Sequence, residues 1–138
     1  EIPEQKKLVH EMLIPIHWGD MDAMGHVNNA SYFRYLETCR IDWMCRIKCM
    51  PDAQGQGPVI VNAHCNFRRQ MKYPASILVQ MGAGHLGRTS VETTYVIRDA
   101  ADEQIIYADG AAKIVWVDFK KEKSTALPDK LRQLLTSL

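Results

Sequence analysis

The chain has 138 residues, of which 24% are charged and 46% hydrophobic, and its formal net charge is +1. This length suits one domain over residues 1–138, and the composition is typical of a globular protein rather than a disordered or fibrous one. A charge this close to zero gives no basis for nucleic-acid binding, which usually depends on an excess of Lys and Arg on one surface.

The distribution of apolar residues and cysteines argues against a membrane span and a zinc site. The longest apolar runs fall far below the roughly 20 residues that a transmembrane helix needs. The four cysteines contain no CxxC pair. No basic-then-apolar leader precedes the domain in this sequence, so we expect a cytoplasmic protein with reduced thiols and no membrane contact.

The first predicted elements are a strand, a loop and a long helix. Residues 8–17 have strand-like spacing, and Pro15 indicates an edge or a bulge. Residues 18–27 lose this periodicity and contain two Gly and two Asp, which is typical of a structured loop. Asn28 and Asn29 offer caps for a helix that ends near Met50. The apolar face of this helix comprises Tyr32, Leu36, Cys39, Trp43 and Ile47.

After a glycine-rich connection up to Pro58, which we expect to be mobile, the hydrophobic period changes to two. Four strands are predicted, and short segments rich in turn residues separate them. Such short connections imply an antiparallel meander. The tail over 128–138 predicts a short closing helix. The strands cover 59–67, 77–83, 89–97 and 104–117.

One strand, one long helix and four further strands indicate an α+β fold. An antiparallel sheet of about five strands would wrap one long central helix, with a short helix at the C-terminus. One helix covers only one sheet face, yet the strands carry apolar residues at both odd and even positions, which point to opposite faces. We therefore expect another copy of the chain to bury the second face or an edge, in a homodimer or a homotetramer.

Residues 18–40, WGDMDAMGHVNNASYFRYLETCR, contain the most informative pattern. Two carboxylates, a Gly, a His and two Asn come directly before or at the start of the long helix. That end of a helix has unpaired amides and a partial positive charge, which suit a developing oxyanion. A thioester carbonyl placed there would be polarised while a carboxylate approached its carbon.

This segment resembles the 4-hydroxybenzoyl-CoA thioesterase-like branch of hot-dog-fold proteins, and its HVNN motif is similar to that of acyl-carrier-protein thioesterases. Tyr73 and Pro74 ahead of a strand, together with the strand pattern, extend the resemblance over nearly the whole chain. The residues that carry it are Asp20, Asp22, Gly25, His26, Val27, Asn28, Asn29, Tyr32, Tyr35, Glu37 and Arg40.

The resemblance implies hydrolysis of an acyl-CoA or acyl-carrier thioester to a free acid and a thiol. Asp22 would be the catalytic carboxylate, as a nucleophile or as a general base that activates water. Amides near Asn28 and Asn29 would hold the thioester oxygen. His26 would donate to the leaving thiolate or orient Asp22, and its structural alternative is a cap on the loop backbone. No cofactor or metal is expected, since coenzyme A enters only as part of the substrate.

Several polar residues are candidates for substrate binding or for bracing the site. Basic groups near strand ends suit the phosphates of coenzyme A or a carrier, although such groups also keep strand edges soluble. Asp20 is expected to brace the loop, and Glu37 and Arg40 to form a helical ion pair. The substrate-binding candidates are Gly25, Tyr32, Arg68, Arg88 and Thr89.

Five other interpretations compete with this one. Without the resemblance, Asp22 would be taken to complement the helix dipole. A haloacid-dehalogenase-type phosphatase needs a hydrophobic parallel strand and alternating βα units, which the sequence does not show. A metal hydrolase could use His17, Asp20, Asp22 and His26, but the sequence has no HExxH pattern and no second ligand cluster. A hot-dog dehydratase would separate Asp and His more widely. The competitor from another class is a non-catalytic hot-dog module that binds acyl-CoA or assembles a complex.

Overall fold

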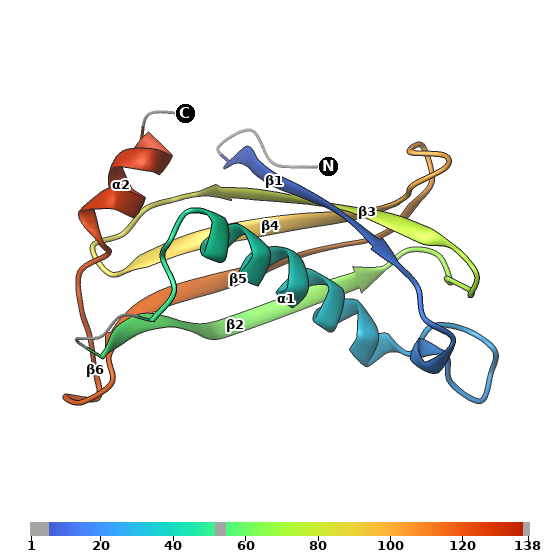
Figure 1. Cartoon of the computed structure of the whole chain (residues 1–138), viewed down its shortest axis with the longest axis horizontal. Helices are drawn as coiled ribbons and strands as arrows, with labels where there is room; N and C mark the ends of the chain where they lie inside the picture. Colours follow the sequence, from blue (N-terminus) through green and yellow to red (C-terminus); the bar gives the residue numbers. More distant parts are fainter. Residues whose placement is uncertain (1–5, 52–54, 137–138) are drawn as a thin grey trace.

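The structure is a computed structural model that describes residues 6–51 and 55–136. A long helix crosses one face of a curved antiparallel sheet, and a short helix lies at one end of that sheet (Figure 1). The elements in chain order are β1 (Lys6–Pro15), the 3-10 helix η1 (Trp18–Asp20), α1 (Asn29–Arg46), β2 (Gln56–Phe67), β3 (Ser76–Gly84), β4 (Ser90–Asp99), β5 (Ile106–Asp118), β6 (Lys123–Ser124) and α2 (Asp129–Thr136).

The predicted α+β class and the antiparallel pairing are confirmed, but the predicted meander is wrong for β2. The strand order is β1-β3-β4-β5-β2, and the two-residue β6, which the pattern did not indicate, pairs with β5. Residues 68–75 therefore cross the end of the sheet instead of forming a tight hairpin. Backbone bonds hold this crossing in place, because Ile16 N–H donates to the Ala75 carbonyl and Val27 N–H to the Met71 carbonyl.

Helix α1 begins as the sequence predicts. The side chain of its N-cap Asn28 accepts a hydrogen bond from the Ala30 N–H at 2.8 Å. Four of the five predicted apolar positions are buried, and Ile47, at the C-cap, is half-buried. Burying a large aliphatic side chain such as Leu36 contributes on the order of 1.5–3 kcal/mol. The sheet side of this core includes Ile77, Val79, Met81, Val91, Tyr95, Ile97, Ala112 and Ile114.

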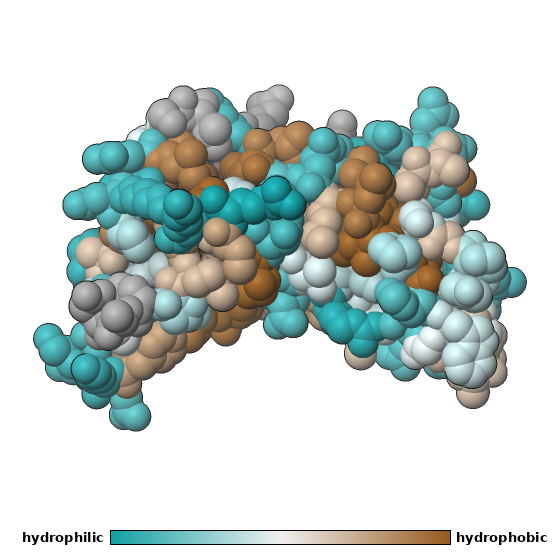
Figure 2. Space-filling view, in the orientation of Figure 1, coloured by the Kyte–Doolittle hydropathy of each residue, from teal (hydrophilic) through white to brown (hydrophobic). Residues whose placement is uncertain are grey.

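Strand β2 forms one edge of the sheet and is unusually exposed. From Ile60 to Phe67 every residue except Cys65 is exposed, including Val61 at 57%. The register shifts between Ile60 and Asn62. Apolar surface continues along part of this edge (Figure 2). Such an edge presents unpaired backbone groups that another strand can pair with.

Two further observations bear on the sequence predictions. No helix in the described part of the chain is long and apolar enough to cross a membrane. All four cysteines are free thiols, and Cys39 is completely buried. The predicted mobile connection lies partly at residues 52–54, outside the described residues, and β2 already begins at Gln56.

A glycine substitution tests the close approach of β2 to β5. A Cβ added at Gly110 would lie 2.4 Å from the His64 carbonyl oxygen, so Gly110→Ala must push the two strands apart. We expect it to lower the free energy of unfolding by about 1–3 kcal/mol in urea titrations. Gly19→Ala is the control, because its Cβ would meet nothing within 4 Å. Equal stability of the two variants would contradict this packing.

Candidate active site

The loop between η1 and α1 fixes the position of Asp22. The backbone N–H of Asp22 donates to the His26 carbonyl at 2.8 Å, and the N–H of Gly25 donates to the Asp22 carbonyl at 3.1 Å. Gly25 has a φ of +78°, which glycine adopts without steric strain. The Asp22 Oδ1 accepts a hydrogen bond from the Met24 N–H at 2.9 Å. The loop thus orients one oxygen of the carboxylate.

Asp20 braces this loop against the helix. Its buried carboxylate accepts hydrogen bonds from the Tyr35 hydroxyl at 2.8 Å and the His17 N–H at 3.1 Å, and it pairs with Arg34. Burial alone would raise the pKa of Asp20. The bonds from Tyr35 and His17 and the charge of Arg34 outweigh burial and hold the pKa below its usual value. The predicted bracing role is confirmed.

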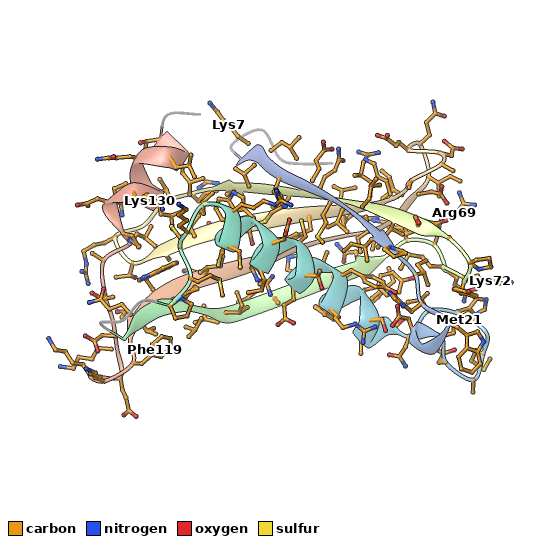
Figure 3. All side chains as sticks on the ribbon, viewed as in Figure 1. Lys7, Met21, Arg69, Lys72, Phe119 and Lys130 are labelled. Atoms are coloured by element: carbon orange, nitrogen blue, oxygen red, sulfur yellow. The ribbon has the colours of Figure 1, made fainter. Side chains whose placement is uncertain are left out.

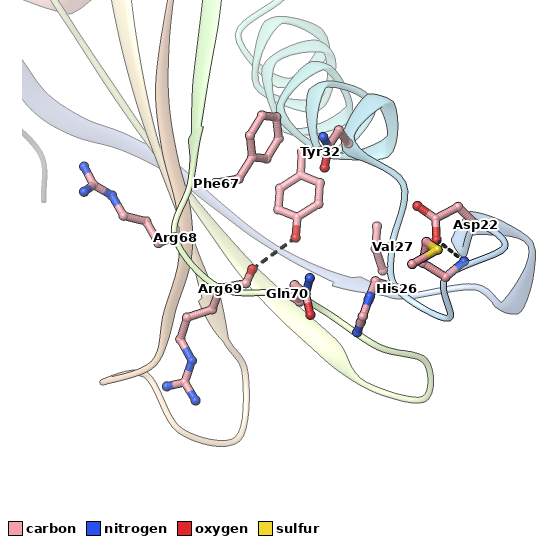
Figure 4. Close-up of a pocket in the computed structure, with 10 residues that line it drawn as sticks. Asp22, His26, Val27, Tyr32, Phe67, Arg68, Arg69 and Gln70 are labelled. Carbon is pink, nitrogen blue, oxygen red and sulfur yellow. Dashed lines mark hydrogen bonds between the residues drawn. The ribbon is translucent and has the colours of Figure 1, made fainter.

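A cavity of about 430 Å³ lies between the start of α1 and the segment that follows β2 (Figure 4). The Tyr32 hydroxyl donates to the Arg69 carbonyl at 3.2 Å and ties the two walls together. Figure 3 shows Met21 of the loop and Lys72 of the crossing segment at the same end of the molecule. The lining residues are Asp22, Met24, His26, Val27, Asn29, Tyr32, Phe67, Arg68, Arg69 and Gln70.

The backbone amides at the helix start are not equally available. The Asn28 N–H already donates to the Asp20 carbonyl at 2.9 Å, and the Ala30 N–H donates to the Asn28 side chain. Within residues 6–51 and 55–136, the Asn29 N–H has no acceptor. Of the two amides that the sequence predicts to bind the thioester oxygen, the Asn28 N–H is thus already bonded and the Asn29 N–H is free within the described residues.

The structure separates the predicted substrate-binding residues. Tyr32 and Arg68 line the cavity with Asp22, whereas Gly25 only shapes the loop turn. The Arg68 guanidinium forms an ion pair with Asp109, with 2.7 Å between Nε and Oδ2, and it points away from Asp22 (Figure 4). The hydrogen bond and charge of Asp109 raise the pKa of Arg68.

Arg88 and Thr89 lie at the opposite end of the sheet from Asp22. They belong to the β3–β4 hairpin, where the Leu127 N–H donates to the Arg88 carbonyl and the Trp116 N–H donates to the Thr89 carbonyl. Asp22 follows β1, at the end where Pro15 pairs with Ser76. A single chain therefore does not bring this hairpin to the cavity.

Sequence reasoning missed Phe67 and Gln70, which line the cavity. They stand some forty residues after the loop, and no local motif marks them, since only the strand order brings them to the helix start. The predicted Glu37–Arg40 ion pair is wrong. Arg40 instead donates from Nη1 to the buried Tyr95 hydroxyl at 3.1 Å.

The polar groups around the cavity are one carboxylate, one imidazole, two amide side chains, two guanidinium groups and one phenol, together with the free backbone N–H of Asn29 at the helix N-terminus. Across the described residues, no three His, Cys, Asp or Glu side chains converge closely enough to hold a metal ion. The arrangement can place an electrophilic carbonyl between the Asn29 N–H and the Asp22 carboxylate.

Comparisons with known proteins identify the family of the chain. Residues 16–135 match the family described as the thioesterase-like superfamily. The chain is 35% identical to the PA2801 protein of Pseudomonas aeruginosa, with a TM-score of 0.88, covering 93% of this chain and 98% of that one. It is 28% identical to the long-chain acyl-CoA thioesterase FadM of Escherichia coli, over 86% of this chain and 90% of that protein.

A more distant structure supports the fold alone. Slr0204 of Synechocystis, a 1,4-dihydroxy-2-naphthoyl-CoA thioesterase, has a TM-score of 0.86 at 14% identity and covers 94% of this chain and 96% of its own. The single long helix on an antiparallel sheet is thus the hot-dog fold of thioesterases, as the sequence predicted. The chain belongs to the thioesterase-like superfamily, and the predicted enzyme class is confirmed.

The Asp20 network can be tested through its pH dependence. Asp20→Asn should lower the free energy of unfolding at pH 7 by about 1–3 kcal/mol, because it removes a charged acceptor from a buried network. Since the folded-state pKa is lowered, the carboxylate stabilises the fold above its unfolded pKa of 3.8, and this contribution is lost as the pH falls through the folded value.

Urea titrations between pH 2 and 7 measure this effect. The gap between the native protein and Asp20→Asn should shrink below about pH 4. Glu103→Gln, at an exposed carboxylate, serves as the control and should leave stability unchanged within about 0.5 kcal/mol. A gap that stays constant down to pH 2 would contradict the assigned charge.

Proposed function

We propose that this protein hydrolyses acyl-CoA thioesters to a free acid and coenzyme A, with Asp22 as the reacting carboxylate. The observation that carries the proposal is the cavity that Asp22 shares with the Asn29 N–H at the start of α1. The similarity to FadM supports coenzyme A as the thiol carrier. An acyl-carrier protein presents the same thioester and is the alternative carrier.

In the proposed reaction, the thioester oxygen accepts a hydrogen bond from the Asn29 N–H. The helix dipole adds stabilisation as negative charge develops on this oxygen. The Met24 N–H holds Oδ1 of Asp22, so Oδ2 is left to act. In one route, Oδ2 attacks the acyl carbon, the thiolate leaves and water cleaves the resulting anhydride. In the other route, Oδ2 takes a proton from a water that attacks the acyl carbon directly, and the C–S bond breaks to release the thiolate.

The remaining polar residues support this step in the proposal. The His26 imidazole lines the same cavity and would protonate the departing thiolate. Asn28 caps the helix and so positions the neighbouring Asn29 N–H. Tyr32 would contact the substrate with its aromatic ring and not with its hydroxyl, because the hydroxyl already donates to the Arg69 carbonyl.

We further propose that two copies pair through their β2 edges in a homodimer. A homotetramer would contain two such dimers. The exposed apolar residues of β2 support this arrangement. A two-fold axis through β2 reverses the second copy, so its β3–β4 hairpin comes to the end of the dimer that holds Asp22. Arg88 and Thr89 of that hairpin would then join Arg68 as candidates for the coenzyme A phosphates.

Replacing Asp22 by Asn tests the reaction. The Asn side chain keeps the hydrogen bond with the Met24 N–H but cannot attack or take a proton, so we expect kcat to fall by about 10²–10⁴. Free-thiol release from short, medium, long and aromatic acyl-CoAs measures the rate. Asp102→Asn is a matched control, since Asp102 also accepts a backbone N–H two residues ahead.

The outcomes separate enzyme from binder. Full activity in Asp22→Asn would remove the assignment. Binding of acyl-CoA without hydrolysis by the native protein would favour the non-catalytic module.

The β2 interface has its own test by size-exclusion chromatography with light scattering. Val61→Asp places two like charges near the proposed two-fold axis, so we expect a shift to monomer. Leu13→Asp, at 65% exposure on the opposite edge strand, should leave the oligomer intact. Dissociation by Leu13→Asp but not by Val61→Asp would overturn the proposed edge.

A further inference from the structure

A second cavity of about 450 Å³ lies between α1 and β2, next to the first along the helix. Phe33 lines the second cavity and Phe67 lines the first, and their ring centroids are 6.5 Å apart. The boundary between the two cavities is therefore aromatic and apolar. The lining residues are Phe33, Arg34, Leu36, Glu37, Arg40, Ile60, Ala63, Ala111 and Ala112.

Arg40 is the unusual member of this set, because it is a cation only 8% exposed in a mostly apolar wall. Its hydrogen bond within the described residues goes from Nη1 to the Tyr95 hydroxyl, and its guanidinium lies 5.8 Å from the Tyr95 ring centroid. None of the ion pairs in this part of the chain involves Arg40.

The remaining donors of Arg40 are accessible from the cavity. Arginine carries five N–H donors, of which Tyr95 takes one. Among the described residues, the Thr94 hydroxyl is the one fully buried side-chain polar atom without a hydrogen-bond partner. The guanidinium nitrogens of Arg40 that do not bond to Tyr95 are therefore not fully buried. Because Arg40 lines the cavity, these donors can meet a ligand there.

Glu37 supplies an acceptor in the same cavity. It precedes Arg40 by about one helical turn, and its carboxylate takes part in no hydrogen bond within the described chain. Arg34 is already paired with Asp20. A plain hydrocarbon would bury the donors of Arg40 without a partner, and a ligand carboxylate would be repelled by Glu37. A hydroxyl group fits both, since it accepts from Arg40 and donates to Glu37.

The spacing along the helix suits an extended acyl chain. Arg40 follows Asn29 by eleven positions, which corresponds to about 16 Å along an α-helix. This length matches about a dozen carbon atoms in an extended chain with bonds of about 1.5 Å. A chain whose thioester lies at Asn29 would therefore place its far end beside Arg40.

We propose that the second cavity holds the far end of the acyl chain, and that Arg40 and Glu37 select acyl groups that bear a hydroxyl there. This inference rests on the proposed thioesterase function. In it, Arg40 determines specificity and takes no part in the chemistry at Asp22.

The test compares dodecanoyl-CoA, 12-hydroxydodecanoyl-CoA and the mono-CoA thioester of dodecanedioic acid. In the native protein we expect kcat/KM for the hydroxylated substrate to exceed that for dodecanoyl-CoA by about tenfold. Arg40→Met, which keeps an unbranched apolar stem but removes the guanidinium, should abolish this preference, while thermal unfolding checks that the variant folds. A ratio of one in the native protein, or a preference for the dicarboxylic substrate, would overturn the proposal.

A second variant tests the cavity without touching Arg40. Ala63 is exposed, and it pairs with Ala112, whose side chain faces the helix. Ala63→Leu should fill the cavity and lower kcat/KM for all three twelve-carbon substrates by at least about tenfold relative to kcat/KM for acetyl-CoA. Unchanged hydrolysis of the long substrates would overturn the acyl path.

Failure of this proposal can be told apart from failure of the thioesterase function. Hydrolysis that depends on Asp22 but shows no hydroxyl preference would refute only the role of Arg40. If no acyl-CoA is cleaved, calorimetry with the S-12-hydroxydodecyl and S-dodecyl thioethers of coenzyme A still measures the preference. Tighter binding of the hydroxylated thioether, lost in Arg40→Met, would support the Arg40 site on its own.

Discussion

The geometry of the site depends on the buried carboxylate of Asp20. It joins the 3-10 turn, through the His17 N–H, to the helix, through Tyr35 and Arg34. The Asp20 carbonyl also accepts the Asn28 N–H, so the same residue fixes where α1 begins. The position of Asp22 and the direction of the Asn29 N–H both follow from this arrangement. Asp20 thereby aligns the loop with the helix start, although it is not one of the groups proposed to act on the thioester.

The second constraint is the crossing of residues 68–75 at the end of the sheet. Strand β2 pairs with β5 and β3 pairs with β1, so β2 and β3 lie far apart in the sheet. The segment that joins them, residues 68–75, therefore passes the start of α1. Bonds to the carbonyls of Arg69 and Met71 anchor that passage to the helix side. The crossing closes the far wall of the first cavity. It leaves the groove beside β2 open, where the second cavity lies next to an exposed strand.

The local patterns of the sequence predicted the elements well, because capping, hydrophobic period and turn residues act over a few positions. The cap at Asn28, the buried face of α1 and the presence of every strand except β6 were predictable in this way. The strand order was not, because periodicity does not say which edges pair. Without the strand order, Phe67 and Gln70 could not be placed at the cavity. Helical spacing alone predicted that Arg40 pairs with Glu37, whereas in the folded chain Arg40 donates a hydrogen bond to Tyr95.

The central claim is that a thioester carbonyl lies between the Asn29 N–H and the side chain at position 22. A crystal structure of the Asp22→Asn protein with a bound acyl-CoA measures this most directly. The account predicts the thioester oxygen about 3 Å from the Asn29 nitrogen, with the residue 22 side chain facing the acyl carbon. A thioester bound away from the start of α1, with the side chain of residue 22 in solvent, would contradict it.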